Sequence, residues 1–215
     1  MSRASPPRRS VSCSSCRSCP SVRARARCWS TRQPARHRCK LPRPRRSRTV
    51  TAPAIDTRAV TDRRTLRFAT TDELRREIER LAEAARAGTL RATGNWSLGQ
   101  AFGHLAAWTD YAYDGYPPEA RPPWFVKVVC RMMKKKFFTR GLPAGVRLPR
   151  VKGGTFGIDP LPLEEGRARL LRALGRLDST PPPRPSPVFG PLSHDEWRRM
   201  NLAHAELHLS FFHPG

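Results

Sequence analysis

Residues 193–211, which read SHDEWRRMNLAHAELHLSF, decide the fold. Ser193 and Glu196 form an S/T-x-x-E capping box, which predicts that a helix starts here. The inward positions then recur at i, i+3, i+4 and i+7, and they are Trp197, Met200, Asn201, His204, Leu207, His208 and Phe211. This period predicts an amphipathic helix that ends near Pro214. One face of that helix carries two histidines among large apolar side chains.

Three further segments show the same helical signals. The expected helices run from Thr70 to Gly88, from Ser97 to Asp114, and from Pro162 to the proline-rich connector at Pro181. The first two start with capping boxes of their own. Four helices without convincing strand alternation predict an all-α fold, namely a four-helix bundle.

The connection between the second and third of these helices is about 50 residues long, far longer than a bundle turn. Within it, residues 124–138 place basic side chains on one side and apolar side chains on the other. This pattern predicts a short basic amphipathic helix carried by a long crossover. We expect its apolar face to cap the bundle and its lysines to be solvated. Docking on a membrane surface and binding of an anionic ligand are the alternatives.

The charge is unevenly distributed. The chain has 41 basic and 17 acidic residues, a formal net charge of +24. Residues 1–50 hold 15 basic residues and no acid, and residues 121–152 hold ten and no acid. The remainder is close to neutral, which argues against a uniformly basic, histone-like protein. No run reaches 18 apolar residues, so a membrane-spanning helix is not expected.

Residues 1–58 are expected to be a disordered tail rich in Arg, Ser, Pro and Cys, followed by one domain over residues 59–215. A mis-assigned start codon is one explanation of such a tail. Its composition also loosely resembles an organellar transit peptide, but the scattered prolines argue against the amphipathic helix that such a peptide forms.

Five of the six cysteines lie in the tail. Cys13, Cys16 and Cys19 have the C-x-x-C-x-x-C spacing of a cluster or zinc site, but no scaffold surrounds them, so we interpret the spacing as accidental. The domain keeps only Cys130, which does not indicate a disulfide framework. A reducing cytoplasm is therefore the expected location.

The histidines are the candidate site. His204 and His208 are four residues apart, so both imidazoles lie on one helix face, one turn apart. His104 lies on the inward side of the helix that starts at Ser97. Three imidazoles from two helices can converge on one metal ion and leave a coordination position open. The alternative is a set of buried histidines that bond to their neighbours. The other three are poor ligand candidates: His37, His194 and His213.

Two motifs resemble a known family. The segment NWSLGQ at 95–100, followed by Gly103-His104-Leu105, resembles the second helix of the DinB-like superfamily. HAELH at 204–208 resembles the H-x-x-x-H motif on its last helix. The details are most similar to a bacterial branch, domain-of-unknown-function family 1569. Supporting segments are RRTLRF at 63–68, TRGLPAG at 139–145 and PVFGPLS at 187–193. The resemblance covers about residues 60–213.

The resemblance implies a four-helix bundle with a long crossover between its middle helices. It also implies a divalent metal, zinc or nickel, held by His104, His204 and His208. Characterised relatives are often transferases or isomerases that use low-molecular-weight thiols. The chain would then be a metal-dependent thiol S-transferase or hydrolase acting on a small molecule, with no catalytic residue assigned. Asn201, one turn before His204, would orient a ligand or water, or would be a polar core residue bonded to a backbone group.

A different class of function remains open. The protein would be a non-catalytic interaction protein whose basic tail and crossover helix bind nucleic acid or an anionic membrane surface. Apart from Trp29 the tail lacks aromatic side chains for base stacking. The partner that the resemblance implies is a small-molecule substrate, such as a low-molecular-weight thiol, and neither nucleic acid nor a membrane is expected. Whether the protein forms a homodimer stays open.

Overall fold

The computed structural model describes residues 55–148 and 151–215. The expectations for residues 1–54, including those for the cysteines Cys13, Cys16 and Cys19 and for His37, lie outside the described residues. The division into a tail and a domain stays a prediction.

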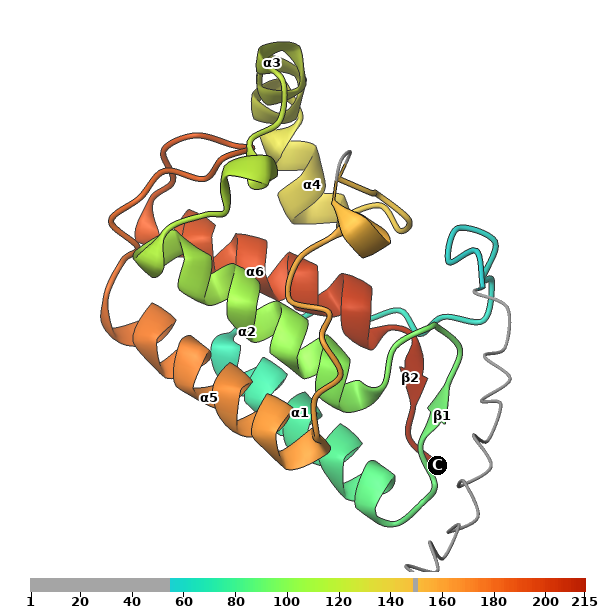
Figure 1. Cartoon of the computed structure of the whole chain (residues 1–215). Helices are drawn as coiled ribbons and strands as arrows, with labels where there is room; N and C mark the ends of the chain where they lie inside the picture. The colour runs from blue at the N-terminus through green and yellow to red at the C-terminus, as the bar shows by residue number, and fades with distance from the viewer. Residues whose placement is uncertain (1–54, 149–150) are drawn as a thin grey trace, which may run out of the picture. The chain divides into compact units, whose positions relative to one another are not determined.

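The described chain is mostly helical (Figure 1). The six α-helices are α1 (Thr71–Arg86), α2 (Leu98–Asp114), α3 (Trp124–Met132), α4 (Lys134–Arg140), α5 (Leu163–Ser179) and α6 (His194–Leu209). Two 3-10 turns, Pro118–Ala120 and Lys152–Gly154, and two short strands, β1 (Arg91–Ala92) and β2 (Phe212–His213), complete the described elements. Among these helices, none has the length and apolar character needed to cross a membrane.

The predicted helix starts are confirmed at the level of individual hydrogen bonds. At Ser97 and at Ser193 the side chain accepts from the backbone N–H three residues on, and the Gln or Glu there accepts in return from the cap backbone. At Thr70 only half of the box forms. The Thr70 hydroxyl accepts from the N–H of Glu73, while the Glu73 carboxylate accepts from the N–H of Ala69.

The main core lies between the four long helices α1, α2, α5 and α6. Its fully buried members include Leu74, Ile78, Leu81, Phe102, Leu170, Leu174 and Leu209. Two glycines permit a close approach of α2 to α5. A Cβ atom added to Gly166 would lie 2.4 Å from the carbonyl oxygen of Gly99. The absence of side chains at this contact therefore sets the position of α2, which carries His104.

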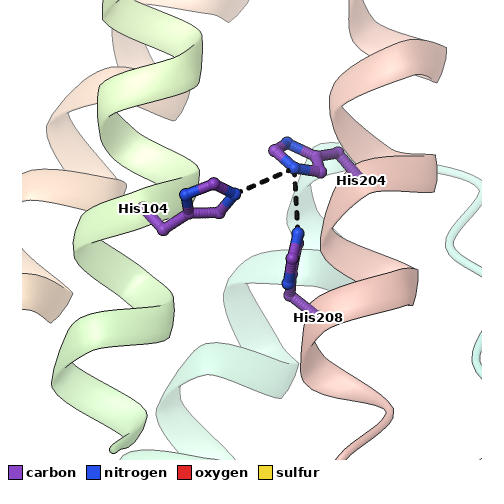
Figure 2. Close-up of side chains that lie close together, drawn as sticks. All are labelled: His104, His204 and His208. Carbon is purple, nitrogen blue, oxygen red and sulfur yellow. Dashed lines mark hydrogen bonds between the residues drawn. The ribbon is translucent and has the colours of Figure 1, made fainter. Parts of the chain in front are cut away.

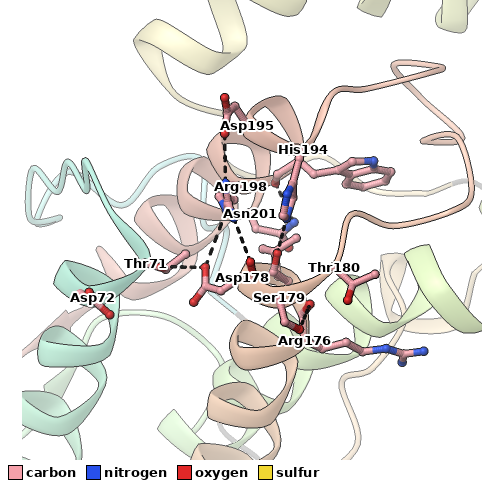
Figure 3. Close-up of polar contacts among 12 residues, drawn as sticks. Thr71, Asp72, Arg176, Asp178, Ser179, Thr180, His194, Asp195, Arg198 and Asn201 are labelled. Carbon is pink, nitrogen blue, oxygen red and sulfur yellow. Dashed lines mark hydrogen bonds and ion pairs between the residues drawn. The ribbon is translucent and has the colours of Figure 1, made fainter.

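Asp178, near the end of α5, links three helices (Figure 3). Its carboxylate accepts a hydrogen bond from the Thr71 hydroxyl of α1 at 2.9 Å, and its backbone carbonyl accepts from Arg198 of α6 at 2.9 Å. Beside it, a ring nitrogen of His194 lies 2.5 Å from the carbonyl oxygen of Leu177. Because a carbonyl only accepts, that nitrogen donates, and His194 fastens the start of α6 to the end of α5.

The expected single helix over residues 124–138 is wrong in one respect, because it consists of two helices. The break is at Met133, whose backbone angles (φ −88°, ψ 2°) leave the helical region. Beyond the break, α4 is tied to α6, since the Phe138 carbonyl accepts a hydrogen bond from Nε of Arg199 at 2.8 Å. This bond holds the end of α4 against α6, whereas α3 has no buried residue.

The expectation that the apolar face of this segment caps the bundle is also wrong for α3. No residue of α3 is buried, and Trp124 and Met132 are 76% and 82% exposed. Figure 1 shows α3 beyond α4, on the side away from α1 and α5. The four long helices already fill the core with their own side chains, and the aromatic rings that pack inward from this segment belong to α4.

The short strands correct one further expectation, the end of the last helix. β1 and β2 pair antiparallel, with Arg91 opposite His213 and Ala92 opposite Phe212. α6 therefore ends at Leu209, earlier than Pro214, because the chain must become extended to pair. The pairing fastens the segment after α6 to the segment before α2.

Candidate metal centre

The three candidate histidines lie together (Figure 2). Nε2 of His204 is 3.2 Å from Nε2 of His104 and 3.0 Å from Nε2 of His208. All three candidate ligand atoms lie within 4.8 Å of one another. His104 comes from α2 and is 1% exposed, whereas the other two come from α6 and are partly exposed. The predicted convergence of imidazoles from two helices is confirmed, and the cluster could hold a metal ion.

A backbone carbonyl fixes the tautomer of one ring. Nδ1 of His104 lies 2.7 Å from the carbonyl oxygen of Phe156. Because that oxygen only accepts, Nδ1 carries the proton, and Nε2 presents a lone pair to the other two rings. A histidine that binds a metal through one ring nitrogen usually donates a hydrogen bond of this kind from the other ring nitrogen.

The remaining hydrogen bonds within the cluster fit a cation better than they fit protons alone. Nε2 of His204 faces the Nε2 atoms of both His104 and His208, yet it can carry only one proton. A single cation between the rings would instead accept a lone pair from each. Two nitrogens bound to one ion at tetrahedral angles lie about 3.3 Å apart. The two separations that involve His204 are close to this value.

The electrostatic surroundings keep the rings neutral. Burial lowers the pKa of His104 to about 4, although its bond to the Phe156 carbonyl acts in the opposite direction. Burial also lowers the pKa of His204 and of His208, and the neighbouring rings lower both further. At neutral pH the three imidazoles are therefore neutral, each with one ring nitrogen free to bind a metal.

The cluster lies on the wall of a cavity of about 410 Å³. The cavity wall is mainly apolar and comes from segments far apart in the chain, and it includes Trp96, Trp108, Tyr116, Phe137, Leu142, Val188 and Phe189. Among the residues that the structure describes, no carboxylate lines it. Burial raises the pKa of Tyr116, so its phenol stays protonated. A largely apolar wall with a few convergent polar groups is typical of a small-molecule site.

The family follows from comparison with known proteins. Residues 60–215 match the model of a family described as "Protein of unknown function (DUF1569)". The chain belongs to the DUF1569 family. This family is generally placed in the DinB/YfiT-like clan, so the resemblance found in the motifs is confirmed. No curated protein and no solved structure matches the chain significantly. The matched range contains all three clustered histidines.

Two tryptophans of the DUF1569 chain contact the cluster, and the sequence did not identify either as a site residue. Trp96 stacks on His208, with ring centroids 5.0 Å apart and an angle of 17° between the planes. Trp108 packs edge-on against His204 at 6.0 Å. The signal in the sequence for Trp108 was its position four residues after His104. The indole nitrogen of Trp108 is buried and has no hydrogen-bond partner among the described residues.

Asn201 also lines the cavity of the DUF1569 chain, but its hydrogen bonds go elsewhere. Its Oδ1 accepts from the Thr109 hydroxyl at 2.7 Å, and its Nδ2 donates to the Trp197 carbonyl at 2.9 Å. Among the described contacts, none joins its side chain to a histidine. These contacts correspond to the second of the two expected roles, that of a polar core residue.

The other two histidines that the structure describes lie outside the cluster, as expected. His194 bonds to the Leu177 carbonyl, and a ring nitrogen of His213 lies 3.3 Å from the carbonyl oxygen of Asp62.

Proposed function

We propose that this DUF1569 protein binds one divalent metal ion, zinc or nickel, through His104, His204 and His208. The bound ion supports a thiol S-transfer or a hydrolysis on a small, largely apolar molecule. In this proposal the four long helices form a DinB-like four-helix bundle, and residues 115–162 are its crossover. The observation that carries the proposal is the convergence of three Nε2 atoms on the wall of a cavity.

The donor set indicates the chemistry. Three neutral imidazoles leave a coordination position for a further ligand, which is the arrangement of catalytic sites more than of structural ones. A divalent ion held there supplies Lewis acidity, which favours the thiolate form of a thiol or the ionised form of water. Imidazole ligands suit both zinc and nickel, so the protein alone does not choose between them.

The protein's own residues bind and orient the substrate. The apolar wall excludes water, which strengthens polar interactions inside the cavity. Trp96 and Trp108 hold the histidine rings in place by packing. The indole N–H of Trp108 is a donor without a partner among the described residues, and a polar atom of a substrate would satisfy it. With no carboxylate among the described lining residues, and with the lining histidines bound to the metal, proton transfer would fall to the thiol or to water.

The direct test is the metal content of the purified full chain. We expect about one equivalent of metal in the wild type, and a loss of at least about tenfold in His204→Ala and in His208→Ala. His194→Gln is the matched control, because it changes a histidine of the same helix that bonds to a carbonyl and lies outside the cluster. Equal metal content in the wild type and the cluster variants, with folding verified by circular dichroism, would remove the proposal.

A second experiment tests the reaction. The metal-loaded protein is screened with low-molecular-weight thiols and small apolar electrophiles, and loss of free thiol is followed. The proposal expects turnover that disappears when the metal is removed and returns when it is added back. Full activity in the metal-free protein would contradict a role of the metal in the reaction.

A further inference from the structure

The exposed apolar side chains of the described chain are concentrated on one short helix. Large hydrophobic residues with high exposure number seven, and five belong to α3: Trp124, Phe125, Val128, Val129 and Met132, between 46% and 82% exposed. Trp124, Val128 and Met132 are separated by four residues, and the other two lie one position on, so all five share one side of the helix. We call this side the α3 apolar face.

The core of the protein does not cover this face. α3 has no buried residue, and Figure 1 shows it projecting beyond α4. The sequence favoured burial of this face against the bundle, with docking on a membrane surface as one of the alternatives. Contiguous exposed apolar surface on a folded protein marks an interaction site.

The charges around the face define the chemistry of the partner. Residues 121–152 hold ten basic residues and no acid. Lys135 and Lys136 of α4 and Arg131 of α3 are exposed, and among the described ion pairs none involves these three. A partner that accepts both surfaces must combine an apolar phase with negative charge. An anionic lipid bilayer has this combination, since acyl chains lie directly beneath phosphate groups.

The length of α3 fits a helix that lies in the interface. At about 1.5 Å per residue, its nine residues span about 14 Å, roughly half of the hydrocarbon thickness of a bilayer. Trp favours the membrane–water interface, and Trp and Phe are typical of the apolar face of a helix that lies in it. A second copy of the chain fits less well, because a symmetric contact through this face would bring two sets of basic residues together without an acid between them.

We infer that the α3 apolar face docks on an anionic lipid bilayer surface, with Trp124 and Met132 inserted and the basic side chains of α3 and α4 on the headgroups. The inference does not depend on whether a metal is bound. On the same segment, Cys130 and Phe137 line the histidine cavity. Docking through α3 therefore places that cavity close to the bilayer.

The test is flotation of the full chain with vesicles of phosphatidylcholine alone and with vesicles that also contain phosphatidylglycerol. We expect the wild type to bind the anionic vesicles and not the neutral ones. The double variant Trp124→Ser, Met132→Ser should bind at least about tenfold more weakly, since each buried large apolar side chain contributes about a factor of ten. Residues 1–50 are unchanged in this variant, so their charge does not explain a loss.

The matched control is Ile55→Ser with Val146→Ser, which changes the two highly exposed apolar residues outside α3 among the described residues. It should bind like the wild type. Equal binding by the wild type and both double variants would overturn the inference, as would equal binding to neutral and anionic vesicles. A wild-type dimer that the α3 variant converts to a monomer in sedimentation velocity would also overturn it, in favour of self-association. All the substituted positions are exposed, so unfolding temperatures should agree.

Discussion

The carboxylate of Glu206 is buried and paired with the guanidinium of Arg199 on the same helix, α6. In the sequence, Glu206 lies between His204 and His208. Nη2 of Arg199 lies 2.8 and 2.9 Å from the two carboxylate oxygens, and the Glu206 side chain is 2% exposed. Nη1 of Arg199 donates to the backbone carbonyl of Phe68, and its Nε donates to that of Phe138. This pair therefore fastens the segment before α1 and the end of α4 to the helix that carries two of the histidines.

Glu206→Gln should lower the free energy of unfolding by about 3 kcal/mol, because it removes the buried charged partner of both Arg199 and Arg67. Chemical denaturation of the full chain measures the change. Asp195→Asn is the control, since Asp195 is 92% exposed and pairs with Arg198 on the surface, so its loss should cost less than about 0.5 kcal/mol. Equal effects of the two substitutions would show that the Arg199–Glu206 pair adds no stability.

Two glycines of α5 should respond to alanine in opposite directions. Gly166→Ala should destabilise the protein by about 1–3 kcal/mol, because the new methyl group meets the Gly99 carbonyl of α2. Gly175→Ala should stabilise it by about 0.5–1 kcal/mol, because a Cβ there has nothing within 4 Å and alanine favours the helix. Thermal and chemical unfolding of both variants check this. A neutral Gly166→Ala would mean that α2 and α5 separate easily.

The two roles expected for Asn201 predict different results for Thr109→Val. This substitution removes the hydroxyl that donates to Asn201, so the free energy of unfolding should fall by about 1–3 kcal/mol. If Asn201 is a polar core residue, the metal content should stay at the wild-type level. A variant that stays folded but loses its metal would assign Asn201 to orienting the histidines.

The stability of the metal-free protein should depend on pH through the histidine cluster. The folded-state pKa of His104 is about 4, below the value near 6.5 of an unfolded chain, so the unfolded state takes up a proton first as the pH falls. The free energy of unfolding should be level above about pH 6.5 and then decrease toward pH 4, by about 1.4 kcal/mol per pH unit for each such group. Denaturation across this range measures it.

His104→Gln is the comparison for that experiment. It removes one of the low-pKa groups, so its stability should fall less steeply between pH 6.5 and pH 4 than that of the wild type. Exposed carboxylates act in the same way in both proteins, and the difference between the two curves isolates the histidine. Identical slopes would mean that His104 is protonated at its ordinary pKa.

The sequence predicted those parts of the fold that local signals determine. The serines at 97 and 193 start their helices because their capping boxes form wherever the chain continues as a helix. His204 and His208 share a face because four residues make about one turn. The position of His104 among the inward-facing apolar residues of α2 was enough to predict that it lies in the same cluster.

Other features depended on contacts that no local pattern contains. The break at Met133 precedes a helix whose end is attached to Arg199, which is 66 positions further along the chain than Met133. Glu206 is buried because its carboxylate accepts hydrogen bonds from Arg199 and from the Phe68 N–H. Its position between two histidines in the sequence does not indicate that it is buried. The exposure of α3 could not be read from an amphipathic pattern, because the pattern does not say what the apolar side meets.

The hydrogen bond from His104 to the Phe156 carbonyl has a consequence for engineering. Phe156 lies between α4 and α5, outside the four long helices, so one ring of the cluster takes its orientation from a connecting segment. A chimera that transplanted only the long helices would inherit every imidazole and lose the acceptor that selects the reactive nitrogen. A transfer that keeps this site must therefore include the long helices together with the connecting segment that contains Phe156.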